Sequence, residues 1–486
     1  MIREHVTLLA DFYEFSMAYA YFKQGRTNEI VYFDLFTRKH PDDNGYLIFN
    51  GLSRVIKTLK DFKFTEEELA YLRKQGFDDD EFIDYLRNLE LKLDMYSVPE
   101  GTVMFKNEPF LTIRGSIIDA QLVETLLLLS VNYSTLITTK ASRIVNAARG
   151  RTILEFGARR AQGYDAAVEG ARCAIIGGCF GTSNTLTGFQ YDVPVTGTIA
   201  HSYIQVFENE YDAFLSYAKV QPNNCILLVD TYNTLKSGVP NAIKVAQDYL
   251  IPNGYRLKGI RLDSGDLAYL SKRARIMLDD AGLFDCKISA SNSLNEDVID
   301  DLLTQGAQID AFGVGENLIT SASSPVIGGV YKIVAAEDGH GEINPLIKLS
   351  ENVEKVTNPG YKRLYRFYDK DTNKAIADYI ALYNEVVPED KLEIFDPIAP
   401  WKRKTIYNYR IRELHVPIFK QGELVYKEPT IEETIQYTQN ELDSLWDEVK
   451  RLKFPHQYYV DLSQQLFDLK NKLIEENRIK HIPNSK

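Results

Sequence analysis

The segment Arg261–Asp266, with the sequence RLDSGD, sets two carboxylates and a guanidinium around a Ser-Gly pair. It follows a β-rich run, LKGIRL, so these groups are expected at a strand end. Asp263 and Asp266 can accept hydrogen bonds from ribose hydroxyls or hold water of Mg²⁺, and Gly265 lets a backbone approach a ligand. The alternative is a polar turn in which Asp266 only caps the next helix.

His201 lies in a second promising segment, GTIAHSY. The residues Val193–Ile199 predict a buried strand, and the helical spacing of Ile204, Phe207, Tyr211, Phe214 and Leu215 predicts a helix from Ser202 onward. Free N–H groups and the helix dipole would stabilise an anion there, including a phosphate on the imidazole. The alternative is a histidine that caps a loop.

Two glycine pairs lie near the ends of later β-rich runs, in FGVGENL (312–318) and VIGGVYK (326–332). Backbone N–H groups at such pairs can cradle a phosphate, although GxG is also common in tight turns. The segment EFGARRAQG (155–163) offers Phe156 to stack on a flat ring and Arg159 to bind a carboxylate. A surface salt bridge is the alternative for the arginines, above all for Arg160.

Repeated β–α units must position these groups. Seven β-rich runs occupy 152–156, 193–199, 225–230, 257–262, 287–291, 310–315 and 326–335, and helical patterns separate most of them. This alternation predicts parallel strands, in a doubly wound sheet or a (β/α) barrel. We favour the barrel because polar residues and glycines follow nearly every strand, and barrel active sites lie at that rim.

The flanking regions differ from the middle of the chain. Residues 1–138 predict an α+β domain, completed by part of 336–425, and residues 139–335 predict the barrel. Residues 336–486 predict a β-hairpin with its turn at Asp369–Asn373, a helix from Thr430 to Lys453, and a last amphipathic helix.

Composition limits the partners. The net charge of −12 argues against a nucleic acid or an anionic membrane, because there is no basic surplus to neutralise phosphates. The four cysteines form no CxxC pair, so neither a metal cluster nor a disulfide framework is expected. Without a signal-like N-terminus or a long apolar run, the protein is expected in the cytoplasm.

Taken in order, these motifs resemble nicotinate phosphoribosyltransferases. The resemblance rests on LLADFYEFSMAYAYF, EFGARRAQG, GTSNTLTG, GTIAHSY, LVDTYNTLKSG, RLDSGD, FGVG, GGVYK and VTNPGYKR, and it covers residues 8–420. It implies a type II phosphoribosyltransferase: an incomplete α/β barrel beside an α+β domain, working as a homodimer with shared active sites. The implied reaction joins nicotinate to phosphoribosyl pyrophosphate with Mg²⁺, coupled to ATP hydrolysis through a phosphohistidine. No metal-binding residue is assigned.

The resemblance also assigns site residues. His201 is the implied phosphate acceptor, and Asp230 is the carboxylate that holds it. Nicotinate is expected between Phe156 and Tyr13 of the partner subunit, with its carboxylate on Arg159 and with Thr198, Ser183 and Arg261 nearby. The phosphoribosyl group is expected at Asp263, Gly265, Ser291, Asn292, Gly313, Gly315, Gly328 and Gly329. Because all three substrates are anions, Arg143 and Lys332 are further candidates for the rim.

Ser183 bears on the choice of substrate. Relatives that use nicotinamide carry Asp at this position of GTSN, and an aspartate accepts from an amide while it repels a carboxylate. Serine removes the repulsion, so nicotinate is favoured over nicotinamide, the nearest alternative. Glu316 departs from the family pattern, which often has Thr there. An inactive, metabolite-binding barrel is an alternative of another class, and the intact His201 and Asp230 argue against it.

Overall fold

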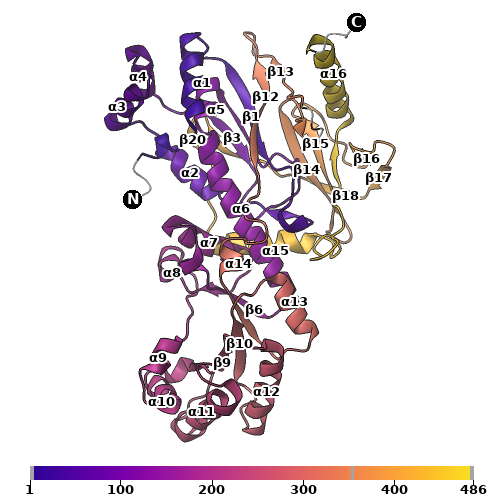
Figure 1. The fold of residues 1–486 in the computed structure, drawn as a ribbon. Coiled ribbons are helices and arrows are strands. Elements are labelled where there is room, and N and C mark those ends of the chain that lie inside the picture. The colour runs from indigo at the N-terminus through magenta and orange to yellow at the C-terminus, as the bar shows by residue number, and fades with distance from the viewer. Residues whose placement is uncertain (1–4, 351, 353–354, 482–486) are drawn as a thin grey trace. The chain divides into compact units, whose positions relative to one another are not determined.

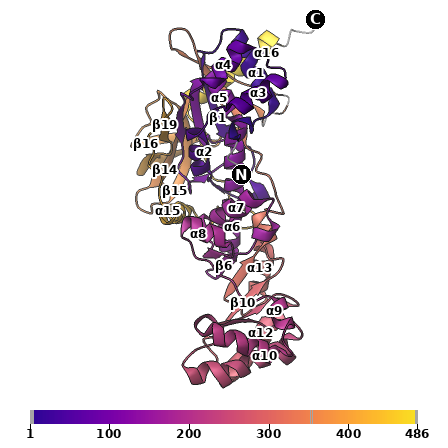
Figure 2. The ribbon, with the colours of Figure 1, turned by 90° about the vertical axis from the view of Figure 1, so that its left-hand side faces the viewer.

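The computed structural model describes residues 5–350, 352 and 355–481, which fold into an α/β structure with one parallel sheet, one mixed sheet and several antiparallel ones (Figures 1 and 2). The chain divides into two compact units. One joins the residues up to Leu136 to those from Val326 onward, and the other is Ile137–Pro325. Within the described ranges, no helix is long and apolar enough to cross a membrane.

A six-stranded parallel sheet forms the centre of the unit Ile137–Pro325. Its order is β7-β6-β11-β10-β9-β8, with every neighbouring pair parallel. The strands are β6 (Thr152–Glu155), β7 (Gly181–Thr182), β8 (Ile226–Leu228), β9 (Gly259–Leu262), β10 (Lys287–Ser291) and β11 (Ala311–Val314). Strands that are consecutive in the chain are neighbours in the sheet except β7 and β8, which lie at its two opposite edges. The pairing of β11 with β6 joins the last strand of this sheet to the first.

Helices follow these strands in the chain, as the β–α alternation predicts. They are α7 (Tyr164–Ile176), α8 (Thr185–Tyr191), α9 (His201–Gln205), α10 (Glu210–Val220), α11 (Val239–Val245), α12 (Leu267–Asp280), α13 (Glu296–Thr304) and α14 (Glu316–Ile319). Aliphatic strand residues such as Leu227, Ile260 and Ile288 are fully buried. Burial of these apolar side chains holds the helices against the sheet.

The segment 193–199 differs from the predicted buried strand. Only Val195 forms a bridge, to Thr182 on β7, and its side chain is 48% exposed. The segment lies at the edge of the sheet, where one side lacks a strand partner. The helix predicted from Ser202 is also wrong in extent, because α9 ends at Gln205 and α10 begins at Glu210.

The other unit is built on a seven-stranded antiparallel sheet of order β13-β12-β1-β5-β3-β19-β20. Its strands are β13 (Ile343–Pro345), β12 (Val330–Glu337), β1 (Ile30–Phe36), β5 (Leu111–Ser116), β3 (Asp94–Ser97), β19 (Val416–Lys420) and β20 (Glu423–Leu424). The β-rich run 326–335, expected among the parallel strands, instead gives β12, which pairs antiparallel with β1. Hydrophobic runs alone do not specify a partner strand, so this assignment was wrong.

The described part of the first third of the chain, from residue 5, contributes six α-helices. They are α1 (Phe12–Lys23), α2 (Leu52–Lys60), α3 (Glu66–Lys74), α4 (Asp80–Arg87), α5 (Ile117–Leu122) and α6 (Glu124–Ala147). The boundary between the two units falls within α6. A short antiparallel pair joins β2 (Leu47–Ile48) to β4 (Val103–Met104).

The region after residue 336 carries more strands than the one predicted hairpin. The hairpin itself is confirmed: β14 (Lys362–Asp369) pairs with β15 (Ala375–Leu382) across the expected turn. These strands lie between β18 (Tyr409–Glu413) and β21 (Val460–Leu462), and β16 (Lys391–Phe395) pairs with β17 (Arg403–Tyr407). The helices are α15 (Ile431–Ser444), shorter than predicted, and α16 (Gln464–His481).

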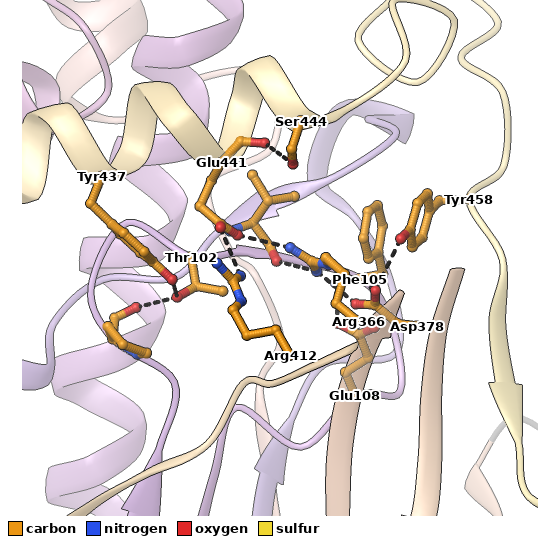
Figure 3. A network of polar contacts seen from close by, with 12 residues as sticks. Thr102, Phe105, Glu108, Arg366, Asp378, Arg412, Tyr437, Glu441, Ser444 and Tyr458 are labelled. Carbon is orange, nitrogen blue, oxygen red and sulfur yellow. Dashed lines mark hydrogen bonds and ion pairs between the residues drawn. The ribbon is translucent and has the colours of Figure 1, made fainter. Parts of the chain in front are cut away.

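A buried ionic network ties α15 to the hairpin (Figure 3). Arg366 on β14 is fully buried and binds Asp378 with two hydrogen bonds of 2.7 and 2.6 Å. Its Nη1 donates to Glu441 of α15 at 2.8 Å, and Glu441 also pairs with Arg412 at 2.7 Å. Glu108 lies beside this network, and burial together with the nearby Asp378 raises the pKa of its carboxyl well above the usual value.

Candidate active site

The carboxyl ends of β8, β9 and β10 bring several predicted site residues together. Asp230 follows β8, Asp263 follows β9, and Ser291 ends β10. Because these three strands are adjacent and parallel, their ends meet at one edge of the sheet. The Ser291 hydroxyl donates to Asp263 Oδ1 across this edge.

Asp230 is the buried carboxylate of the cluster. Its side chain is 1% exposed. Its Oδ2 accepts hydrogen bonds from the Asp263 backbone N–H at 2.8 Å and from the Ser264 hydroxyl at 2.6 Å. Its Oδ1 is buried and has no hydrogen-bond partner among the described residues. One carboxylate oxygen therefore fixes the RLDSGD turn, and the other is left for the site.

His201 contacts this cluster from the start of α9. Its Nε2 lies 3.9 Å from Asp230 Oδ1 and 3.8 Å from Asp263 Oδ2, outside hydrogen-bond distance of both. Its Nδ1 lies 3.0 Å from the Thr231 hydroxyl. The two ring nitrogens thus face different chemistry, with carboxylates near one and a hydroxyl near the other.

Sequence reasoning missed Thr231. Thr231 stands directly after Asp230 in LVDTYNT. A hydroxyl side chain directly after a predicted strand is the sequence feature that could have identified it as a site residue. Its partner His201 comes from a different segment, 30 residues earlier, so only the folded chain reveals the contact.

Arg261 joins the 193–199 segment to the cluster. Its Nη1 donates to the Thr198 hydroxyl at 2.6 Å, and its Nη2 lies 3.7 Å from Asp263 Oδ1. Its Nε is buried without a hydrogen-bond partner in the described part of the chain. The guanidinium thus retains a donor for an anionic or carbonyl group.

The turns after β9 and β10 adopt unusual backbone conformations. Gly265 has φ +78°, a value that favours glycine. Asn292 and Ser293 have φ of 92° and 50°, two successive non-glycine residues in the left-handed region. Such values carry a conformational cost and occur often at ligand-binding turns. Asp266, by contrast, caps α12 by accepting from the Tyr269 N–H at 2.9 Å.

Phe156 lies against the glycines of the GVG segment. A Cβ at Gly313 would stand 2.4 Å from Phe156 Cδ2, and one at Gly315 would stand 3.3 Å from the Phe156 carbonyl oxygen. Close approach of the ring therefore explains the glycine at 313 without a ligand. The phosphate role of these glycines stays a prediction.

Arg159 and Ser183 are exposed in loops after β6 and β7. The neighbouring Arg160 has Nε 3.7 Å from Glu316 Oε2, the surface ion pair considered as its alternative. Arg143 was a candidate rim cation, but it is buried and its Nε pairs with Glu296 at 3.0 Å. Because its charge is already paired with Glu296, Arg143 is a poor candidate for binding an anionic substrate.

Four residues predicted for the site belong to the other unit, which joins the residues up to Leu136 to those from Val326 onward. Tyr13 lies on α1 with 45% exposure, and partial burial with nearby Glu124 raises its pKa. Gly328 has φ +64°, and a Cβ at Gly329 would stand 2.1 Å from Asn132 Oδ1. Lys332 pairs with Glu124 at 3.7 Å. The roles of these residues in a shared site stay predictions.

No described residues form a group of three or more His, Cys, Asp or Glu side chains that could hold a metal ion. The four cysteines are free and buried.

Three family models cover nearly the whole chain. The nicotinate phosphoribosyltransferase N-terminal domain matches residues 8–132, the nicotinate phosphoribosyltransferase family matches 152–359, and the C-terminal domain matches 361–470.

Curated proteins and solved structures are similar over the same range. A nicotinate phosphoribosyltransferase of Bacillus subtilis is 45% identical, covering 97% of this chain and 96% of its own. One of Dictyostelium discoideum is 35% identical, covering 95% and 87%. The crystal structure of human nicotinic acid phosphoribosyltransferase superimposes with a TM-score of 0.82 at 28% identity, covering 96% and 99%.

Proposed function

The chain belongs to the nicotinate phosphoribosyltransferase family, and we propose from this membership how its own residues carry out that activity in NAD biosynthesis. The reaction joins nicotinate to phosphoribosyl pyrophosphate and yields nicotinate mononucleotide and pyrophosphate. The cluster of His201, Asp230, Arg261 and Asp263 at the ends of adjacent parallel strands is the single observation that carries the proposal.

The sugar donor occupies the turns after β9 and β10. Asp263 accepts from ribose hydroxyls, with Ser291 holding its Oδ1 and Asp230 holding its backbone N–H. The left-handed turn at Asn292, with Gly265, Gly313 and Gly315 of the same unit, supplies backbone donors to the 5′-phosphate. Transfer at C1 of the ribose passes through an oxocarbenium-like state, so these residues contribute positioning and electrostatics.

Nicotinate occupies the loops after β6 and β7. Phe156 stacks on the pyridine ring, with Tyr13 of a second subunit on the opposite face in a homodimer. The exposed Arg159 binds the carboxylate, and the hydrogen-bonded pair of Arg261 and Thr198, in the same unit, assists it. Ser183 leaves the loop without a carboxylate that would repel the substrate.

His201 accepts a phosphoryl group from ATP, and its geometry favours Nδ1 as the accepting atom. Nδ1 must carry a lone pair and no proton, so the ring proton resides on Nε2 and the Thr231 hydroxyl donates to Nδ1 until the phosphoryl group takes its place. There the carboxylates of Asp230 and Asp263, at 3.9 and 3.8 Å, stabilise a proton and would repel an incoming phosphate. Nδ1 faces only the neutral hydroxyl of Thr231.

Magnesium fits this site through one or two carboxylates. Asp230 Oδ1, a buried acceptor without a hydrogen-bond partner in the residues described, and Asp263 Oδ2 are the candidates. The ion would neutralise charge on the pyrophosphate, a role that needs few protein ligands.

The finer architecture and location also remain proposals. The ring-like strand order of the parallel sheet supports an incomplete (β/α) barrel. The division into 1–138, 139–335 and 336–486 and a cytoplasmic location stand as predicted from the sequence.

The direct test is to incubate the purified chain with nicotinate, phosphoribosyl pyrophosphate, Mg²⁺ and ATP. We expect nicotinate mononucleotide and acid-labile phosphate on the protein. His201→Ala should abolish the phosphoprotein and ATP hydrolysis, whereas His340→Ala, at an exposed turn, should leave both unchanged. Absence of the mononucleotide from the wild type would sink the proposed function, and a labelled His201→Ala would sink the phosphohistidine.

A further inference from the structure

Glu155, the last residue of β6, has a fully buried side chain between the two loops proposed to bind nicotinate. Burial raises the pKa of its carboxyl, while hydrogen bonds from Thr182 and Gly157 lower it. A buried carboxylate is costly unless its oxygens are occupied, so both oxygens need donors.

One oxygen fixes the loop that carries Phe156 and Arg159. The Gly157 N–H donates to Glu155 Oε1, and the Phe156 N–H donates to the Val314 carbonyl at 2.7 Å. Gly157 has no room for a side chain, because a Cβ would stand 2.6 Å from Ile319 Cβ and 2.8 Å from Glu155 Oε1. The loop therefore starts from a closely defined position.

The other oxygen fixes the loop that carries Ser183. The Thr182 hydroxyl donates to Glu155 Oε2 at 2.6 Å and accepts from the Asn184 N–H at 2.9 Å. The Ser183 N–H donates to the Glu155 backbone carbonyl at 2.9 Å. Glu155 thus holds both sides of Ser183 and the start of the Phe156 loop at once.

We propose that Glu155 is a positioning residue for nicotinate, which sets the spacing of Phe156 and Arg159 from Ser183 through Gly157 and the Thr182 hydroxyl. It does not touch the substrate. The inference rests on the proposed function, because it takes these loops as the nicotinate site. Loss of this link should weaken the binding of nicotinate. It should leave the binding of phosphoribosyl pyrophosphate unchanged, because the turns proposed to bind that substrate follow β9 and β10.

Thr182→Val tests this link, because it removes the hydroxyl and keeps the shape. We expect KM for nicotinate to rise about tenfold, the effect of one lost hydrogen bond in the link. KM for phosphoribosyl pyrophosphate and kcat should change by less than about twofold by comparison. Thr182→Ser should restore the wild-type KM.

Ser271→Ala is the matched control. The buried Ser271 hydroxyl also accepts a backbone N–H, from Gln308 at 3.1 Å, but that contact precedes β11 and lies away from the strand exits. Should Thr182→Val not fold, Glu155→Gln gives the same comparison. The glutamine side-chain amide would face the Thr182 hydroxyl oxygen, which already accepts from the Asn184 N–H, so this substitution also weakens the link between Glu155 and Thr182.

Equal changes in both KM values, or a nicotinate KM that matches Ser271→Ala, would overturn the inference. Failure of the proposed function looks different, because the wild type itself would then form no mononucleotide.

Discussion

The two ring nitrogens of His201 have different neighbours in the folded chain. The sequence assigned it one partner, Asp230, yet its ring nitrogens face Thr231 on one side and two carboxylates on the other. Asp230 does most of its hydrogen bonding to the RLDSGD turn. It therefore acts on the histidine through charge at 3.9 Å, with no direct hydrogen bond.

Asp230→Asn should lower ATP hydrolysis by about a hundredfold, because the protonated Nε2 loses one of two stabilising charges. Steady-state ATPase assays with nicotinate present measure this. Asp266→Asn is the control, since an asparagine also caps α12 and the change should stay within about twofold. Equal losses in the two variants would contradict the role given to Asp230.

Ser183→Asp should shift the choice of base. A carboxylate in this exposed loop repels nicotinate and accepts from an amide, so KM for nicotinate should rise by about tenfold or more. Activity with nicotinamide should increase relative to the wild type. Rates with the two bases in parallel measure the ratio, and an unchanged ratio would exclude this position from recognition.

At the scale of elements, α15 is attached to the hairpin by charge as well as by apolar contact. Glu441 neutralises parts of both Arg366 and Arg412, and Tyr437 on the same helix contacts the Thr102 hydroxyl at 3.0 Å. Figure 3 shows this helix lying over the network. The helix therefore stabilises the unit that contains it.

Glu441→Ala should lower the free energy of unfolding by about 3 kcal/mol, because Arg412 loses the carboxylate it pairs with and the buried Arg366 keeps only Asp378 of its two carboxylates. Chemical denaturation followed by circular dichroism measures this. Glu393→Gln is the control: it breaks an exposed pair with Arg403, and no measurable change is expected. A small effect at Glu441 would mean that solvent reaches the network.

At the scale of the whole molecule, an acidic protein handles anionic substrates. The net charge is −12, and the cations of the site must act locally, with Arg261 held at the cluster. Some of the acidic side chains that give this net charge are buried in the fold. Burial raises the pKa of Asp461 on β21 to about 7, with nearby Asp396 adding to the shift.

This shift predicts how stability depends on pH. The pKa of Asp461 is higher folded than unfolded, so its contribution is present below about pH 4 and is lost as pH rises to about 7. Asp461→Asn should therefore gain stability relative to the wild type across this window, by at most about 1.4 kcal/mol per pH unit, and level off above it. Glu90→Gln, at an exposed carboxylate, should show no such trend in denaturation series at several pH values.

The sequence by itself determined the elements whose local signals agree. Strand β10 has the predicted limits, the hairpin turns at Asp369–Asn373, and Thr430 caps α15 with Glu433. Local propensity and capping suffice there, because the stabilising contacts lie within a few residues. The site motifs could likewise be ranked by chemistry, since strand exits of parallel sheets converge on one edge.

Only the tertiary structure decided the pairings over long distances. The run 326–335 has strand propensity, but its antiparallel pairing is with β1, residues 30–36, which lie far away in the chain. The apolar segment 193–199 ends at a sheet edge and stays partly exposed. The contact of Thr231 with His201 and the hold of Glu155 on two loops arise in the same way. The spacing of residues along the chain does not predict such contacts, because they form only when separate strands bring their ends together.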